Sequence, residues 1–270
     1  MNTTKLIIDP DELEKHMHDP DIVIVDLCKP KQYAQAHIPG ARFVSYGDIV
    51  RIERPVAGLL PSASDFSMLV SSLGITADKT VVAYDDEGGG CAARFIWTLH
   101  VFGHEKTALL NGGLHSWANE NHPLTSEIPA PANSAYTLIN SGRHSAERDY
   151  IISKLDDDHT ALLDARSLVE YTGEKKFAER GGHIPGAMRY EWTDAMDRNR
   201  NLRMFPAEQI QPKLDELGIT KDKEVIVYCQ THHRSAYSWL MLRVMGYEDV
   251  KGYPGSWSDW GNRLDTPVEV

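Results

Sequence analysis

A cysteine followed closely by basic and hydroxyl side chains is the feature of this sequence best suited to chemistry. Cys229 ends the apolar run Val225–Tyr228, and the residues after it read Gln-Thr-His-His-Arg before Ser235. A free cysteine has a pKa of about 8.5, and positive surroundings lower it to roughly 3.5–7.5. The thiolate would then be available as a nucleophile at neutral pH. A buried, inert cysteine is the alternative interpretation, but a flank this polar and basic is not typical of a core.

The elements on either side of Cys229 suggest how a negative charge would be held there. The β-rich run Val225–Tyr228 predicts a buried strand, and apolar side chains at helical spacing over 236–245, ended by Gly246, predict a helix. A short loop between a strand and a helix N-terminus turns backbone N–H groups inward and forms a nest for one anion. We expect this nest to hold the thiolate, helped by Arg234.

Composition limits the class of protein. The chain has 270 residues, enough for one large domain or two ordinary ones, and its 41% hydrophobic and 25% charged content is typical of a soluble globular protein. Its net charge of −11 and lack of a basic tract argue against nucleic acid or an anionic membrane as a partner.

We see no apolar run of membrane-spanning length and no signal peptide. The scattered cysteines Cys28, Cys91 and Cys229 match no disulfide framework or metal spacing, which favours the cytoplasm.

Short motifs recur in the same order in the two halves of the chain. The four pairs are His37–Ala41 with His183–Ala187, Gly74–Lys79 with Gly218–Lys223, Val25–Leu27 with Leu163–Ala165, and Gly113–Trp117 with Tyr253–Trp257. A long internal period indicates two copies of one domain. Strands alternating with helices indicate an α/β fold, so we expect two tandem domains, each a mostly parallel sheet flanked by helices.

The first copy shows the expected elements most clearly. Apolar runs predict strands over Asp21–Leu27 and Thr80–Tyr84, and helices are expected over Pro10–His18, Ser64–Leu73 and Cys91–Phe102. In parallel sheets, ligands bind beyond the carboxyl ends of the strands, which is where Cys229 falls in the second copy.

The boundary between the copies is a segment without periodicity. Residues 126–134 are rich in proline, alanine and serine, and we take 126–145 as a linker between domains 1–125 and 146–270. The copies differ most at 173–182, a segment inserted before the second His-Ile-Pro-Gly-Ala turn.

The repeat also shows which of the two corresponding loops carries a cysteine at the end of its strand. Tyr84 matches Tyr228, so Asp85 stands where Cys229 stands, and Cys91 lies further on, inside the next helix. We therefore expect the first domain to act as a scaffold and as one wall of the cleft. The acidic stretch 85–87 is interpreted as a solvated or interface loop, and it lacks the lysine and hydroxyl residue of a phosphate-binding loop. The turn residues His37 and His183 are expected to have local hydrogen-bond partners.

These residues together resemble a known family. The doubled α/β domain, Asp85 in one loop and Cys229 in the other, and the two His-Ile-Pro-Gly-Ala turns resemble a tandem-domain rhodanese, a thiosulfate sulfurtransferase. The resemblance covers nearly the whole chain, and Cys-Gln-Thr-His-His-Arg is similar to the loop of a bacterial subgroup. It implies that Cys229 takes sulfane sulfur from thiosulfate, becomes a persulfide and passes the sulfur to cyanide or another thiophilic acceptor. The N–H nest would hold the persulfide anion, with no metal or organic cofactor.

The resemblance also suggests roles for the neighbouring side chains. An arginine at the position of Arg166 helps to bind the anionic donor in the family; a surface ion pair is the alternative. Arg234 is either an anion clamp or an arginine bonded to its own loop. The other expected substrate-binding residues are those of the loop: Gln230, Thr231, His232 and His233. The histidines are expected to shape local charge rather than to shuttle protons.

One departure from the family leaves the donor open. Animal thiosulfate sulfurtransferases carry a donor-binding lysine two places after the cysteine, where this chain has Thr231. Mercaptopyruvate sulfurtransferases have a nearly neutral loop, whereas this one is basic. The cationic loop favours thiosulfate, and a protein persulfide or another sulfur compound is the alternative donor.

Two other functions fit parts of the pattern. Cysteine-dependent phosphatases place five residues between cysteine and arginine, whereas four separate Cys229 from Arg234. A loop that is shorter by one residue suits a sulfur atom bound to the cysteine better than a phosphate ester bound above it. The second alternative is a persulfide carrier that delivers sulfur to a partner protein, and the missing lysine keeps it open.

Overall fold

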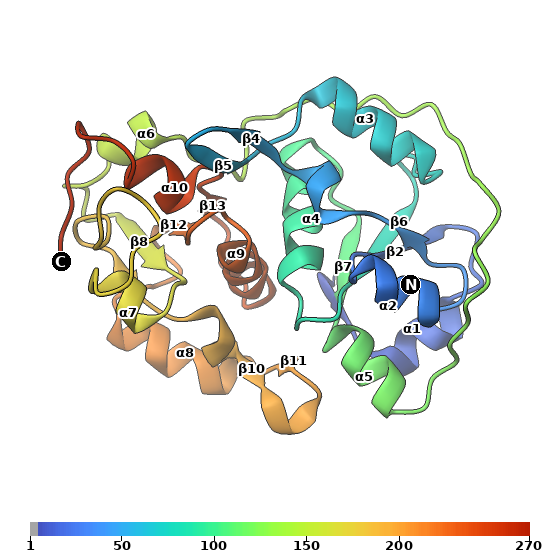
Figure 1. Ribbon diagram of the computed structural model, residues 1–270. Coiled ribbons are helices and arrows are strands. Elements are labelled where there is room, and N and C mark those ends of the chain that lie inside the picture. Colours follow the sequence, from blue (N-terminus) through green and yellow to red (C-terminus); the bar gives the residue numbers. More distant parts are fainter. Residues whose placement is uncertain (1–4) are drawn as a thin grey trace. The chain divides into compact units, whose positions relative to one another are not determined.

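The protein is described here by a computed structural model covering residues 5–270, and its chain forms two compact units (Figure 1). Unit 1 comprises the described residues up to Ile49, together with Pro61–Gly142 and Asp197–Met204. Unit 2 comprises Val50–Leu60, Arg143–Met196 and Phe205–Val270. Among the described residues, no helix is both long enough and apolar enough to cross a membrane.

The core of unit 1 is a five-stranded parallel sheet in the order β1-β7-β6-β2-β3. Its strands are β1 (Ile7–Ile8), β2 (Ile22–Asp26), β3 (Arg42–Phe43), β6 (Thr80–Tyr84) and β7 (Thr107–Leu110). Its helices are α1 (Pro10–His16), α2 (Pro30–Gln35), the short 3-10 helix at Tyr46–Ile49, α3 (Ala63–Ser72), α4 (Gly90–Val101) and α5 (Gly113–Asn119). Two further elements, a 3-10 helix at Arg198–Arg200 and β11 (Arg203–Met204), come from the second half of the chain.

The core of unit 2 is a four-stranded parallel sheet in the order β13-β12-β8-β9. Its strands are β8 (Thr160–Asp164), β9 (Met188–Arg189), β12 (Glu224–Tyr228) and β13 (Val250–Gly252). Its helices are α6 (Arg148–Ile152), α7 (Leu168–Tyr171), the 3-10 helix at Trp192–Ala195, α8 (Ala207–Glu216), α9 (Arg234–Val244) and α10 (Ser256–Trp260). The hairpin strands β4 (Arg51–Glu53) and β5 (Val56–Leu59) also lie in this unit, and β10 (Met196–Asp197) spans its border with unit 1.

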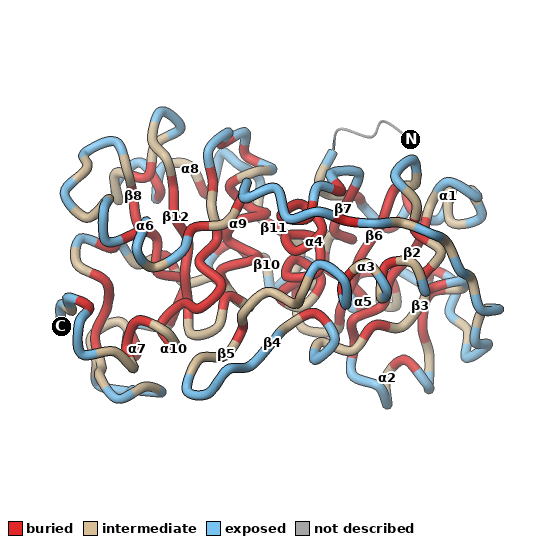
Figure 2. Tube along the Cα trace, turned by 90° about the horizontal axis from the view of Figure 1, so that it is seen from above, coloured by how far each residue is buried: buried red, intermediate tan, exposed pale blue. Residues whose placement is uncertain are grey.

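The central strands form because their apolar runs are buried along nearly their whole length. All five residues of β6 are buried, and so are four of the five in each of β2, β8 and β12 (Figure 2). Continuous burial is expected of parallel strands with both faces covered. The sequence therefore predicted the sheets well: Thr80–Tyr84 is a strand as expected, and the predicted helix at Cys91–Phe102 is α4, shifted by one residue.

The carboxyl ends of the central strands are built alike in both units. Tyr84 pairs with Asp26 in the sheet of unit 1, and Tyr228 pairs with Asp164 in unit 2. The hydroxyl of each tyrosine accepts the N–H of the isoleucine in the His-Ile-Pro-Gly-Ala turn of the same unit, at 3.1 Å in both cases. The repeat inferred from the sequence thus extends to matching hydrogen bonds.

One of the four proposed motif pairs is out of register. The N–H of Leu114 donates to Asp85 O at 2.9 Å, and the N–H of Trp257 donates to Cys229 O at 3.0 Å. Gly113 therefore corresponds to Ser256, and the pairing of Gly113–Trp117 with Tyr253–Trp257 is wrong by three residues. The sequence match failed because both Trp257 and Trp260 offered a partner for the single tryptophan of the first copy.

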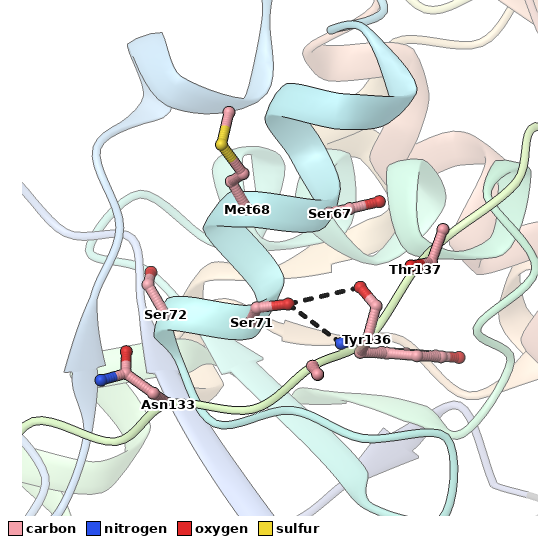
Figure 3. Close-up of a pocket in the computed structure, with 8 residues that line it drawn as sticks. Ser67, Met68, Ser71, Ser72, Asn133, Tyr136 and Thr137 are labelled. Atoms are coloured by element: carbon pink, nitrogen blue, oxygen red, sulfur yellow. Dashed lines mark hydrogen bonds between the residues drawn. The ribbon is translucent and has the colours of Figure 1, made fainter.

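The linker is irregular in structure but is bound to unit 1 over part of its length. Ser71 of α3 hydrogen-bonds both the N–H and the carbonyl of Tyr136, at 3.1 and 3.3 Å (Figure 3). Ser67 of the same helix accepts the N–H of Leu138 at 2.9 Å. This segment and α3 line an open pocket on the surface of unit 1. The chain passes to unit 2 between Gly142 and Arg143.

Each unit also contains a short segment from the other half of the chain, which the sequence analysis did not anticipate. Residues 50–60, with β4 and β5, belong to unit 2, where β5 lies beside α10 (Figure 1). Residues 197–204, with β11, belong to unit 1, where Arg203 forms ion pairs with Asp9 at 2.7 Å and Glu120 at 2.5 Å. The two segments follow β3 and β9, which occupy matching places in the repeat.

Candidate active site

Cys229 lies directly beyond the carboxyl end of β12, where it begins the segment 229–235, which comprises a loop and the first two residues of α9 and is called the Cys229 loop below. Its side chain is buried, with 1% of the residue exposed. The loop leads into α9, whose first residue is Arg234. The strand, loop and helix are arranged as the apolar runs and the stop at Gly246 predicted.

The thiol of Cys229 is surrounded by groups that favour its charged form. Burial by itself raises the pKa of the thiol, but the positive charge of Arg234 opposes it, as do hydrogen bonds from Ser235 and from the backbone of Thr231. Together these outweigh burial, and the pKa of Cys229 is lowered. The thiols of Cys28 and Cys91 have raised pKa values, because burial raises them and neighbouring carboxylates add to the effect.

The backbone of the Cys229 loop is held in place by α10. The N–H of Cys229 donates to the hydroxyl of Ser256 at 3.3 Å, and the N–H groups of Trp257 and Ser258 donate to the carbonyls of Cys229 and Gln230 at 3.0 and 2.9 Å. Ser256 is buried and has a φ of +49°, in the region that glycine favours, as does its counterpart Gly113. The sequence analysis missed Ser256, because its role depends on a residue 27 positions earlier.

Arg234 is bound to a partner from outside its own loop. Its Nη1 and Nη2 atoms lie 2.7 and 2.8 Å from the two carboxylate oxygens of Glu170 in α7. This carboxylate partner was anticipated by neither interpretation of Arg234, the anion clamp or the arginine bonded to its own loop. Glu170 also accepts from the Ser167 hydroxyl at 2.8 Å. The Ser-x-x-Glu spacing of a capping box was a signal for Glu170 that the sequence analysis overlooked.

The Glu170–Arg234 pair makes unit 2 sensitive to acid. Burial raises the pKa of Glu170, but hydrogen bonding and attraction to Arg234 lower it from 4.5 to about 2. A carboxyl with a depressed pKa stabilises the fold above its unfolded value, and that stability is lost as pH falls from about 4.5 to about 2. We expect Glu170→Gln to lower the thermal midpoint at neutral pH by an amount corresponding to about 3 kcal/mol. Melting curves of both proteins between about pH 6 and pH 3 should converge; a gap that stays constant would contradict this assignment.

Arg166 lies in a buried ion pair, whereas the two roles considered from the sequence were donor binding and a surface ion pair. The residue is 1% exposed, and its guanidinium contacts both carboxylate oxygens of Asp164, the closest approach being 2.6 Å. It also donates to the carbonyl of Gly182 at 2.7 Å and lies 4.6 Å from the ring centre of Trp257. The surface ion pair is wrong because this pair is buried. Its guanidinium is occupied by Asp164 and the Gly182 carbonyl, which argues against direct contact with a donor.

This arrangement predicts that Arg166 acts on stability. Arg166→Ala leaves the Asp164 carboxylate buried without its partner, a change that typically costs about 3–5 kcal/mol. We expect a large fall in the thermal midpoint and little change in the KM for thiosulfate. Arg263→Ala is the control, because Arg263 pairs with Asp259 at 2.9 Å while 41% of its side chain is exposed, and such pairs contribute about 1 kcal/mol or less. A raised KM with unchanged stability would restore Arg166 as a donor-binding residue.

The remaining residues of the Cys229 loop differ in exposure. His232 is fully buried, has a φ of +54°, and its Nδ1 lies 2.7 Å from the Ser235 hydroxyl. Gln230, Thr231 and His233 are half-buried. Gln230 donates to the carbonyl of Phe177 in the inserted segment 173–182, at 3.3 Å. All the sequence-predicted site residues except Arg166 thus belong to the Cys229 loop.

Comparisons with known proteins agree with this geometry. The rhodanese-like domain family matches residues 9–120 and 147–263. The chain is 46% identical to a thiosulfate sulfurtransferase of Azotobacter vinelandii, a match that covers 98% of this chain and 97% of that protein.

The chain belongs to the rhodanese family.

Other relatives of this rhodanese extend the comparison. It is 34% identical to the sulfur carrier protein TtuD of Thermus thermophilus, over 98% of this chain and 96% of that protein. Among solved structures, YnjE superposes with a TM-score of 0.89 at 21% identity, covering 98% of this chain and 68% of YnjE. At that identity the likeness concerns the fold alone.

The corresponding loop of unit 1 in this rhodanese holds a carboxylate where unit 2 holds a thiol. Asp85 accepts the N–H groups of Glu87, Gly89 and Ala92 at 3.0, 2.8 and 2.9 Å. It is fully buried, so the solvated alternative for this loop is wrong at Asp85, whereas Asp86 and Glu87 are half-buried. Burial and the charge of Glu87 raise the pKa of Asp85 to about 6. Both loops thus have backbone N–H groups directed at an acidic side chain.

The turn histidines are locally satisfied, as expected. His37 Nδ1 lies 2.7 Å from the carbonyl of Tyr33, and His183 Nδ1 lies 3.0 Å from the carbonyl of Tyr171. Each ring stacks on the tyrosine that it contacts, at centroid distances of 4.0 and 3.6 Å. These histidines hold their turns rather than contribute to the Cys229 loop.

Proposed function

We propose that this protein is a thiosulfate sulfurtransferase in which Cys229 carries the transferred sulfur. The single observation that supports this best is the buried Cys229 thiol at the carboxyl end of β12, where Arg234 and the hydrogen-bond donors of Ser235 and Thr231 surround it and favour its charged form. Membership of the rhodanese family and 46% identity to a protein named as a thiosulfate sulfurtransferase point to the same activity. The three cysteines are free thiols, which supports a reducing compartment such as the cytoplasm.

The reaction divides into two displacements at sulfur. The Cys229 thiolate attacks the outer sulfur of thiosulfate, the sulfur–sulfur bond of the donor breaks, and sulfite leaves with the electron pair. Cyanide or another thiophilic acceptor then attacks the terminal sulfur of the Cys229 persulfide, and the thiolate departs as the leaving group. Neither step needs a proton or an external oxidant. The N–H groups of the loop stabilise the anionic sulfur in both states.

The loop supplies the binding groups in this proposal. The N–H of Thr231 and the Ser235 hydroxyl reach the sulfur, and Arg234 provides positive charge while bound to Glu170. We assign Gln230, Thr231 and His233 to the rim, because they are half-buried rather than enclosed. His232 is enclosed and bonds Ser235, so we assign it to positioning.

A persulfide carrier for a partner protein is the second candidate. It is favoured by 34% identity to a sulfur carrier protein and by Thr231, which offers no cation for a small anionic donor. The two functions differ in acceptor rather than in the chemistry at Cys229. A carrier would load sulfur from a donor but turn over slowly with cyanide.

Steady-state kinetics with thiosulfate and cyanide test the proposed activity. Varying both substrates should give the parallel double-reciprocal lines of a ping-pong mechanism. Rapid loading with slow turnover would favour the carrier. Hydrolysis of a phosphate ester, without sulfur transfer, would overturn both and indicate a phosphatase.

A further inference from the structure

The hairpin formed by β4 and β5 comes from the first half of the chain but contacts α10 in unit 2. Ala57 of β5 binds Ser258 of α10 through both of its backbone groups. The N–H of Ala57 donates to the Ser258 hydroxyl oxygen at 3.0 Å, and that oxygen lies 2.9 Å from the Ala57 carbonyl. Ser258 is 3% exposed, so this connection is shielded from water.

Ser258 also contacts the Cys229 loop through its backbone. Its backbone N–H donates to the carbonyl of Gln230 at 2.9 Å. The peptide bond that follows joins this carbonyl to the N–H of Thr231, and the two groups point in opposite directions within one plane. That N–H is one of the donors that lower the pKa of Cys229. Fixing the carbonyl at Ser258 therefore aims the N–H at the sulfur.

Gly58, the next residue of the hairpin, packs directly on the same loop. It is buried and has a φ of +78°. A Cβ at this position would lie 2.7 Å from the carbonyl carbon of Thr231 and 2.9 Å from its Cβ, closer than real Cβ atoms approach. Only a residue without a side chain allows the hairpin to lie this close to Thr231.

We propose that the β4–β5 hairpin positions the anion-binding N–H groups of the Cys229 loop, with Gly58 and Ser258 as positioning residues. This inference rests on the proposed function, because it concerns the same sulfur anion. Neither residue touches the reacting atoms. Disturbing them should therefore change the acidity of the thiol and the rate of sulfur transfer more than the binding of the donor.

Gly58→Ala tests the inference, and Gly218→Ala is its matched control. Both glycines lie in unit 2 with left-handed φ values, +78° and +69°, so alanine introduces similar backbone strain at each. Nothing lies within 4 Å of a Cβ at Gly218, whereas Thr231 blocks one at Gly58. The readouts are the pH dependence of Cys229 alkylation, measured with Cys28 and Cys91 replaced by serine, and steady-state kcat and KM.

We expect Gly218→Ala to match the parent in thiol pKa and kcat/KM. Gly58→Ala should raise the thiol pKa by about one unit, leaving about tenfold less thiolate at a pH below both values, and should lower kcat about tenfold with little change in KM. Ser258→Ala adds no backbone strain and should shift the pKa in the same direction, so the inference stays testable if Gly58→Ala does not fold.

A folded Ser258→Ala variant with the parent's thiol pKa and kcat would overturn the inference, as would a folded Gly58→Ala variant that matches Gly218→Ala. Failure of the proposed function has a different signature. In that case the parent protein itself would show an ordinary thiol pKa and would take up no sulfur from thiosulfate.

Discussion

Cys229→Ser is expected to abolish sulfur transfer, with a loss on the order of 10³-fold or more in kcat. A serine hydroxyl in the same nest is not ionised near neutral pH and forms no persulfide, so both displacements fail. The fold should be preserved, because serine is close in size to cysteine and the loop is held through the backbone contacts of Cys229 with Ser256 and Trp257.

The other two cysteines are the matched controls for this variant. Cys28→Ser and Cys91→Ser should keep most of the activity, because burial and neighbouring carboxylates raise the pKa values of both thiols. A rate assay on the three variants and circular dichroism of each separate lost chemistry from lost structure. Loss of activity in Cys91→Ser with full activity in Cys229→Ser would mean that the nucleophile lies in unit 1.

Arg234→Gln is expected to raise the pKa of the Cys229 thiol by about one to two units. Burial already raises this pKa, and the charge of Arg234 is the strongest of the effects that oppose it. At a pH below both values, the rate of alkylation by iodoacetamide should then fall about tenfold or more. The rate of sulfur uptake from thiosulfate should fall with it, because the thiolate is the attacking species.

Arg234→Lys separates charge from geometry at this position. A lysine keeps the positive charge near the thiol but cannot reproduce the two-pronged contact with Glu170, so the thiol pKa should stay closer to the wild-type value. If Arg234→Gln titrates like the wild-type protein, the low pKa arises from the N–H groups alone, and the electrostatic role of Arg234 is wrong.

The sequence predicted those parts of the site that depend on local patterns. The apolar run before Cys229 and the helical spacing after it specify a strand, a loop and a helix, and the structure contains β12, the Cys229 loop and α9 in that order. The equivalence of Asp85 and Cys229 was also predictable. It follows from the repeat, and both loops direct backbone N–H groups at the side chain.

The missed features depend on contacts between residues far apart in the chain. Ala57 and Ser258 are 201 residues apart, and no periodicity in either segment indicates that they meet. The surroundings of Arg166 could be predicted only in part. Its partner Asp164 lies only two residues away, and Asp26 occupies the matching strand end in unit 1, so the repeat marked Asp164 as structural, whereas the burial of the pair depends on the fold.

Intact mass measured after incubation with thiosulfate tests the central claim most directly. The account predicts that the protein gains the mass of one sulfur atom, that peptide mapping locates it on Cys229, and that cyanide removes it. Cys229→Ser should gain nothing under the same conditions. A protein that shows thiosulfate:cyanide sulfurtransferase activity while Cys229 remains unmodified, or that carries the added sulfur on Cys28 or Cys91, would contradict the account.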